Sequence, residues 1–138
     1  MTASTAPTNS LTPKRSFGLL RLIAAAVIAA IVNLIVFFLA SATGTTITTF
    51  GKPMGAYEPI VASLVPIVIV GLIVWLVLPY WRWIGGIAPV VGGIVAALTA
   101  IAPLVIVGGA SGLWLAPMHI IAAVAWYFGT RSRRLSLK

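Results

Sequence analysis

The chain has 138 residues, no cysteine, a net charge of +8, 61% hydrophobic residues and only 7% charged residues. A soluble domain carries roughly 25% charged residues, so in water this chain would expose large apolar patches and aggregate. The composition therefore favours a lipid bilayer as the solvent, and the lack of cysteine excludes disulfides, thiolate nucleophiles and cysteine metal sites.

The first part of the chain predicts a tail, one membrane span and a polar loop. Residues 1–16 are rich in Thr, Ser, Pro and Ala and have no apolar period, which is typical of a disordered tail. A first helix is expected to cross the membrane over residues 22–42. Residues 43–58 are polar and contain glycine and proline breakers, so they form the only substantial predicted loop, which carries Lys52 and Glu58.

Three more apolar stretches follow, each long enough for a hydrocarbon core of about 30 Å at about 1.5 Å per residue. They are expected over residues 59–80, 84–107 and 113–128. The uncharged stretch between Arg82 and Arg131 is too long for one span, and its glycine-rich sequence at 108–112 indicates a turn. The sequence therefore predicts an all-α, four-helix transmembrane bundle over residues 17–130, followed by a basic tail at 131–138.

The charges also predict an orientation. Four spans place both termini on one side, where eight of the nine basic residues fall, and only Lys52 falls on the other side. Because cytoplasmic segments carry an excess of Lys and Arg, both termini are expected in the cytoplasm of a multi-pass plasma-membrane protein. In a competing interpretation the first 42 residues are a cleaved signal peptide, but the apolar run is longer than the usual 7–15 or so residues.

Small residues and prolines predict how the helices pack and bend. Lipid tails are as apolar as leucine, so transmembrane helices associate through close packing of small residues and through polar contacts. Small residues recur at a spacing of four in the first and third spans, as Ala25/Ala29, Ala26/Ala30, Gly92/Ala96 and Gly93/Ala97. We favour internal packing of these rows over a dimer or partner interface. Pro66 and Pro103 fall inside the second and third spans and should kink them.

A short set of polar residues forms the candidate site. Asn33, Ser63, Thr99 and His119 lie inside the predicted spans, and Glu58 lies at the outer end of the second. We expect them in one polar layer that faces the interior of the outer half of the bundle. The favoured role is hydrogen bonding between helices, with His119 as a neutral imidazole and Glu58 as a helix-terminal acid or a partner of Lys52. The alternative is a titratable pair in which His119 exchanges protons with Glu58.

Enzyme motifs are absent from the sequence. One histidine and one carboxylate side chain cannot form a carboxylate pair or a zinc site with three protein ligands. No nucleophile elbow, phosphate-binding loop or dinucleotide-binding motif occurs. We therefore expect no catalytic residue, no metal and no cofactor. The basic residues flank apolar segments without an interleaved binding face, so a nucleic-acid partner is not expected either.

Four short segments carry a family resemblance: Asn33 in the first span, Glu58-Pro59, Ala102-Pro103-Leu104 and Met118-His119-Ile120. Over about residues 17–131 the chain resembles a family of small actinobacterial four-span membrane proteins of unknown function. The resemblance implies a four-helix plasma-membrane protein with Asn33 and His119 at the matching polar positions. It implies no activity.

Three functional hypotheses follow from these features. The first is a non-enzymatic accessory or scaffold subunit that contacts a membrane-protein partner or a second copy within the bilayer. The alternative is a small oligomeric transporter or channel that uses the polar layer. The third is a lipid-binding protein whose basic inner rim holds anionic headgroups.

Overall fold

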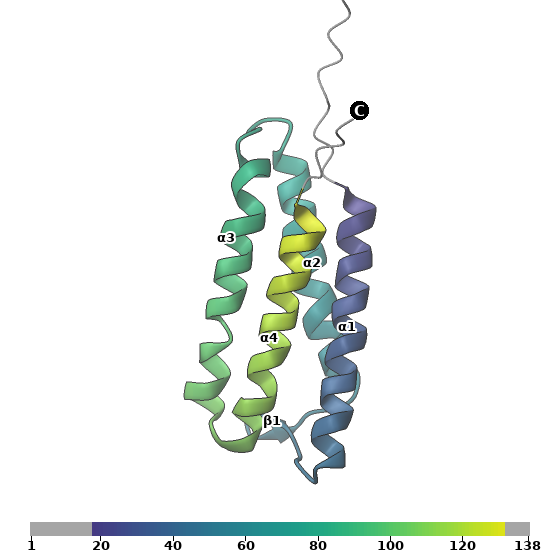
Figure 1. The fold of residues 1–138 in the computed structure, drawn as a ribbon, viewed down its shortest axis with the longest axis vertical. Coiled ribbons are helices and arrows are strands. Elements are labelled where there is room, and N and C mark those ends of the chain that lie inside the picture. Colours follow the sequence, from purple (N-terminus) through teal and green to yellow (C-terminus); the bar gives the residue numbers. More distant parts are fainter. Residues whose placement is uncertain (1–17, 132–138) are drawn as a thin grey trace, which may run out of the picture.

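The computed structural model describes residues 18–131, which form four long antiparallel helical segments joined by short connections (Figure 1). The elements are α1 (Leu19–Ala42), β1 (Thr48–Thr49), β2 (Lys52–Pro53), α2 (Glu58–Val77), α3 (Ile84–Leu98), the π-helical turn η1 (Pro103–Val107) and α4 (Gly109–Thr130). The predicted tail at 1–16 lies outside the described residues, as does the predicted tail at 131–138 except for Arg131.

All four helical segments are long and apolar enough to cross a membrane, with α3 and η1 counting as one segment from Ile84 to Val107. The fourth segment begins earlier than expected, at Gly109 instead of about residue 113. Gly108 and Gly109 make this possible, because their φ angles of 66° and 53° are positive values that glycine adopts readily, and they reverse the chain over two residues. Most of the predicted turn at 108–112 is therefore helical.

The helices are arranged in the order α2, α1, α4, α3. The helix α1 packs along both α2 and α4, and α4 also packs along α3. In Figure 1, α4 lies between α3 and α1. The helices α2 and α3 contact each other at few positions, although they are consecutive in the chain. The helices α2 and α3 therefore pack little against each other.

Small residues bring α1 close to its two neighbours. Ala26 and Ala29 are buried in a core cluster with Leu22, Ile67 and Trp126. Glycines of the facing helices leave room for Leu22: a Cβ atom at Gly71 of α2 would overlap its side chain. The alanine rows of the first span thus lie inside the bundle, where close backbone approach holds membrane helices together.

A tryptophan fixes α3 on α4. The Trp126 indole lies against Gly92, where a Cβ atom would overlap the ring. Its Nε1–H donates a hydrogen bond of 2.9 Å to the carbonyl oxygen of Ala88. This contact gives Gly92 a packing role within the chain.

The antiparallel strands β1 and β2 form a hairpin, which closes the end of the bundle at which α1 ends and α4 begins. Ile47 is buried in a second cluster with Ala40, Leu115 and Met118. The backbone N–H of Thr48 donates to the hydroxyl of Ser111, at 3.1 Å, in the first turn of α4. The base of the hairpin is therefore fixed to both α1 and α4.

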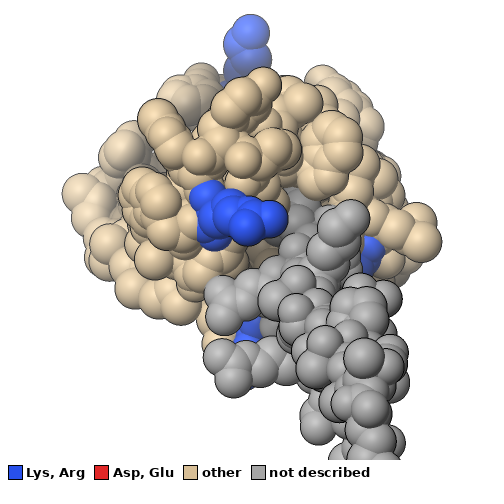
Figure 2. All heavy atoms as spheres, turned by 90° about the horizontal axis from the view of Figure 1, so that it is seen from above, with Lys and Arg blue, Asp and Glu red and all other residues tan. Residues whose placement is uncertain are grey.

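The opposite end carries both ends of the described chain and the connection between α2 and α3 (Figure 1). Figure 2 looks onto this end, where basic side chains are visible and, among the described residues, no acidic one. Arg21 is held there by a hydrogen bond of 3.2 Å from its Nε to the carbonyl oxygen of Gly129. The sole acidic residue, Glu58, begins α2 at the hairpin end.

Candidate functional site

Asn33 is the centre of the polar contacts inside the bundle. Its amide Nδ2 donates to the hydroxyl of Ser63 at 2.8 Å and to the carbonyl oxygen of Met118 at 3.2 Å. Ser63 in turn donates to the carbonyl oxygen of Pro59 at 2.6 Å. Asn33 and Ser63 are 3% and 2% exposed, so one buried amide joins α1, α2 and α4.

The orientation of this amide follows from its partners. The Met118 carbonyl can only accept, and the Ser63 proton is already directed at Pro59, so both positions facing Asn33 require a donor. The NH2 group must therefore face them, and Oδ1 points away. Among residues 18–131 this oxygen is buried without a hydrogen-bond partner. It is an acceptor available to water or to another donor.

Thr99 does not join this group, which corrects the prediction of a layer that faces the interior throughout. Its side chain is exposed, and its hydroxyl donates to the carbonyl oxygen of Ala96 at 2.6 Å in the same helix. Thr99 is the C-cap of α3, and a threonine can satisfy its hydroxyl on the preceding turn wherever it faces. Threonine polarity is therefore a weak indicator of an inward face.

His119 also bonds within its own helix. Its Nδ1 lies 3.0 Å from the carbonyl oxygen of Leu115. A carbonyl only accepts, so Nδ1 carries the proton, and in the neutral ring Nε2 is an acceptor. The ring is half-buried. His119 follows Met118, whose carbonyl binds Asn33, but no hydrogen bond joins the imidazole to Asn33, Ser63 or Thr99 within the described chain.

Glu58 lies in the first turn of α2, where the helix dipole favours an anion, and Pro59 follows it. Its backbone N–H donates to the carbonyl oxygen of Gly55 at 3.1 Å. Within residues 18–131 no ion pair joins Glu58 to Lys52. Of the two roles that the sequence suggested for Glu58, the structure therefore supports that of a helix-terminal acid.

The two predicted kink sites differ. The helix α2 runs unbroken past Pro66. The third segment is interrupted instead: α3 ends at Leu98, and a π-helical turn begins at Pro103. The backbone then approaches α4 so closely that a Cβ atom at Gly112 would lie 2.6 Å from the carbonyl oxygen of Pro103. Proline removes a helix hydrogen bond in both cases, but only the third segment is interrupted.

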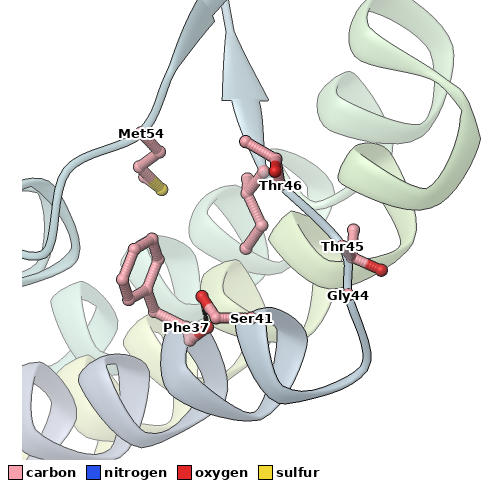
Figure 3. A pocket seen from close by; sticks show the side chains of 7 residues that line it. Phe37, Ser41, Gly44, Thr45, Thr46 and Met54 are labelled. Carbon is pink, nitrogen blue, oxygen red and sulfur yellow. Dashed lines mark hydrogen bonds between the residues drawn. The ribbon is translucent and has the colours of Figure 1, made fainter.

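A hollow of about 250 Å³ lies between the end of α1 and the hairpin loop (Figure 3). Phe37 and Met54 face each other across it, and the Ser41 hydroxyl lies at its floor, where it donates to the Phe37 carbonyl. The sequence did not indicate this hollow, because its walls come from a helix end and a loop whose relative position no periodicity reveals. Its mixed lining carries no titratable group.

The chemistry open to these residues is limited. Within residues 18–131 no group of three His, Cys, Asp or Glu side chains could hold a metal ion. The buried site contains an amide, a hydroxyl and carbonyl oxygens, which can bind by hydrogen bonds and cannot supply a nucleophile activated by a base.

Fold and site together define a small all-helical protein with four segments apolar enough to cross a membrane and one buried amide between three of them. The model of a family of unknown function, DUF6069, matches residues 13–136, and the chain belongs to this family. No curated protein and no solved structure matches the chain. The family membership agrees with the resemblance noted in the sequence and, like it, supplies no activity.

Proposed function

We propose that the four segments cross the plasma membrane with both termini in the cytoplasm. Arg21, Arg82 and Arg131 lie at the end of the bundle where the described chain begins and ends, and Lys52 lies in the hairpin at the other end. The excess of basic residues at one end supports a cytoplasmic position for it. The resemblance supports an actinobacterial source.

Within the membrane the protein acts as a non-enzymatic accessory or scaffold subunit. The observation that carries this function is the weak packing of α2 against α3, which leaves both helices largely exposed. In their most apolar stretches only 17% of the residues of the second segment and 11% of those of the third are buried, against 33% for the fourth. Consecutive antiparallel helices with a short connection ordinarily pack along their length. The few contacts between these two helices and the exposure of both support a partner helix packed beside them.

A helix of a partner protein suits the exposed faces of α2 and α3 better than lipid chains alone. Gly86 of α3 is exposed, and a Cβ atom added there would meet no atom within 4 Å. Lipid gains nothing from a glycine, whereas a second helix can approach its backbone closely. The exposed aliphatic side chains of α2 and α3 supply the remaining apolar contact area.

Photo-crosslinking in native membranes tests this function. A photoreactive residue is placed at exposed positions of α2 and α3 (Val65, Ile69, Ile87 and Ile94) and, as a matched control, at Ile28 and Ile35 of α1. We expect protein adducts from α2 and α3 and only lipid adducts from α1. Equal protein adducts from α1, or none from α2 and α3, would contradict the accessory role.

One observation favours a second candidate, a small oligomeric transporter or channel. The Oδ1 atom of Asn33 is a buried acceptor without a partner in the described chain, and a permeating solute or water molecule could donate to it. Purified protein in liposomes then shows a flux that falls when Asn33→Leu or His119→Ala is introduced. If none of a set of ions and small polar solutes crosses these liposomes faster than it crosses empty liposomes, the transporter or channel function is contradicted.

A further inference from the structure

The tip of the hairpin is a two-residue turn with an unusual occupant. Thr49 pairs with Lys52 across the antiparallel ladder, so Phe50 and Gly51 form the turn. Their φ angles are 50° and 75°, which are the positive values of a type I′ turn. Asn, Asp and Gly are the residues that ordinarily occupy the first of these positions, because an aromatic side chain with a positive φ is strained.

Phe50 gains nothing inside the protein that would offset this strain. Its side chain is 99% exposed, the highest exposure among the large hydrophobic residues described. A residue held in an unfavourable backbone region without a contact of its own points to a contact with something else.

The base of the hairpin that carries this ring is fixed to the bundle. Ile47 is 2% exposed, and Met54 N–H donates to its carbonyl oxygen at 2.8 Å, which extends the ladder toward the bundle. The hydroxyl of Ser111 accepts from Thr48 N–H. The hairpin lies at the end of the bundle where α4 begins (Figure 1), and its base is bonded to the first turn of α4.

The surroundings of Phe50 have the chemistry of a membrane interface. Lys52 is exposed and is the only basic residue at this end of the described chain. Tyr57, which precedes α2, is 67% exposed. An aromatic ring beside a lysine near the helix ends matches the headgroup region, where rings enter the acyl boundary and Lys meets phosphate. A protein partner would be recognised by a larger patch than one ring and one ammonium group.

We infer that the tip Phe50-Gly51-Lys52 is a lipid anchor that inserts the Phe50 ring into the headgroup–acyl boundary of the outer leaflet and places Lys52 beside phospholipid phosphates. The anchor would fix the hairpin against the membrane surface and so hold the ends of α1 and α2 at a set depth. This inference rests on the membrane insertion proposed above.

Spin labels test the anchor in lipid nanodiscs of phosphatidylcholine and phosphatidylglycerol. The chain has no cysteine, so Phe50→Cys carries the only label. We expect this label to be relaxed several-fold more by oxygen, which partitions into lipid, than by a water-soluble nickel chelate. Ile31→Cys, at an exposed position of α1, controls for insertion, and Thr46→Cys, at the base of the same loop, controls for position.

The outcomes separate the anchor from insertion itself. A label at residue 31 in lipid with a label at residue 50 in water overturns the anchor and leaves insertion intact. A label at residue 50 that neither oxygen nor the nickel chelate reaches indicates a protein contact, and this result also overturns the anchor. If residue 31 itself is in water, both proposals fail.

A second measurement leaves the native Phe50 in place. Nitroxide lipids should broaden the NMR signals of the Thr49 methyl group several-fold more in the native protein than in Phe50→Gly. Glycine suits the positive φ at this position, so the hairpin itself should persist in this variant. Equal broadening in the two proteins would contradict the anchor.

Discussion

Asn33 joins three helices through one amide group, and its hydrogen bonds give a testable order of stabilities. Asn33→Ala removes two interhelical bonds and should cost about 1–2 kcal/mol, because such bonds in membranes average about 0.6 kcal/mol and a small cavity adds to the loss. Asn33→Asp should cost more than Asn33→Ala. Aspartate has no N–H to offer, and its oxygens would face the Met118 carbonyl and the Ser63 oxygen, which both require a donor.

Denaturant or thermal unfolding in detergent micelles measures this order, with Thr99→Ala as the control. The Thr99 hydroxyl is exposed and bonded within its own helix, so its loss should change the free energy of unfolding by less than about 0.5 kcal/mol. An Asn33→Asp variant as stable as Asn33→Ala would show that the amide is not oriented as described.

At the residue scale the sequence predicted which side chains are polar but not which of them meet. Asn33 and Ser63 do meet, because both lie on helix faces that pack together. Thr99 and His119 satisfy themselves on their own helices, an option that every serine, threonine or histidine in a helix has. Only the relative rotation of the helices decides between these outcomes, and apolar sequences of nearly uniform hydropathy carry little information about rotation.

At the scale of the elements, two adjacent glycines of α3 should respond oppositely to the same change. Gly92→Ala would drive a methyl group into the Trp126 indole and disturb its bond to Ala88, so it should cost about 1–3 kcal/mol. Gly93→Ala meets its nearest atom at 3.7 Å, an ordinary contact, and should be neutral or stabilise by up to about 1 kcal/mol, because alanine favours the helix. Unfolding midpoints of the two variants, measured side by side, check this contrast, and equal losses would contradict the packing of α3 on α4.

The helices themselves were the most predictable part of the molecule, because long uncharged apolar stretches leave few alternatives. The predicted start of the fourth segment was late because Gly108 and Gly109 reverse the chain, whereas the sequence shows three more small residues, Ala110, Ser111 and Gly112, after them. The proline predicted a distortion of the third segment near Pro103, but it did not predict that the turn after it would be π-helical. The π-helical turn begins where Gly112 of α4 closely approaches the backbone of Pro103.

At the scale of the whole molecule, the weak packing of α2 against α3 is the feature that sequence could not indicate. Consecutive segments with a short connection are expected to pack together, and here α4 takes that place beside α3. The accessory role, the orientation and the lipid anchor at Phe50 all depend on one claim, namely that the bundle crosses the membrane with its basic end in the cytoplasm.

Labelling of single cysteines by a membrane-impermeant maleimide tests that claim most directly. The natural chain has no cysteine, so Lys52→Cys in the hairpin and Arg82→Cys in the connection between α2 and α3 report the two ends without background. We expect Lys52→Cys to be labelled in intact cells and Arg82→Cys only after the membrane is permeabilised. Labelling of Arg82→Cys in intact cells, with Lys52→Cys protected, would contradict the orientation, and equal labelling of both would contradict membrane insertion.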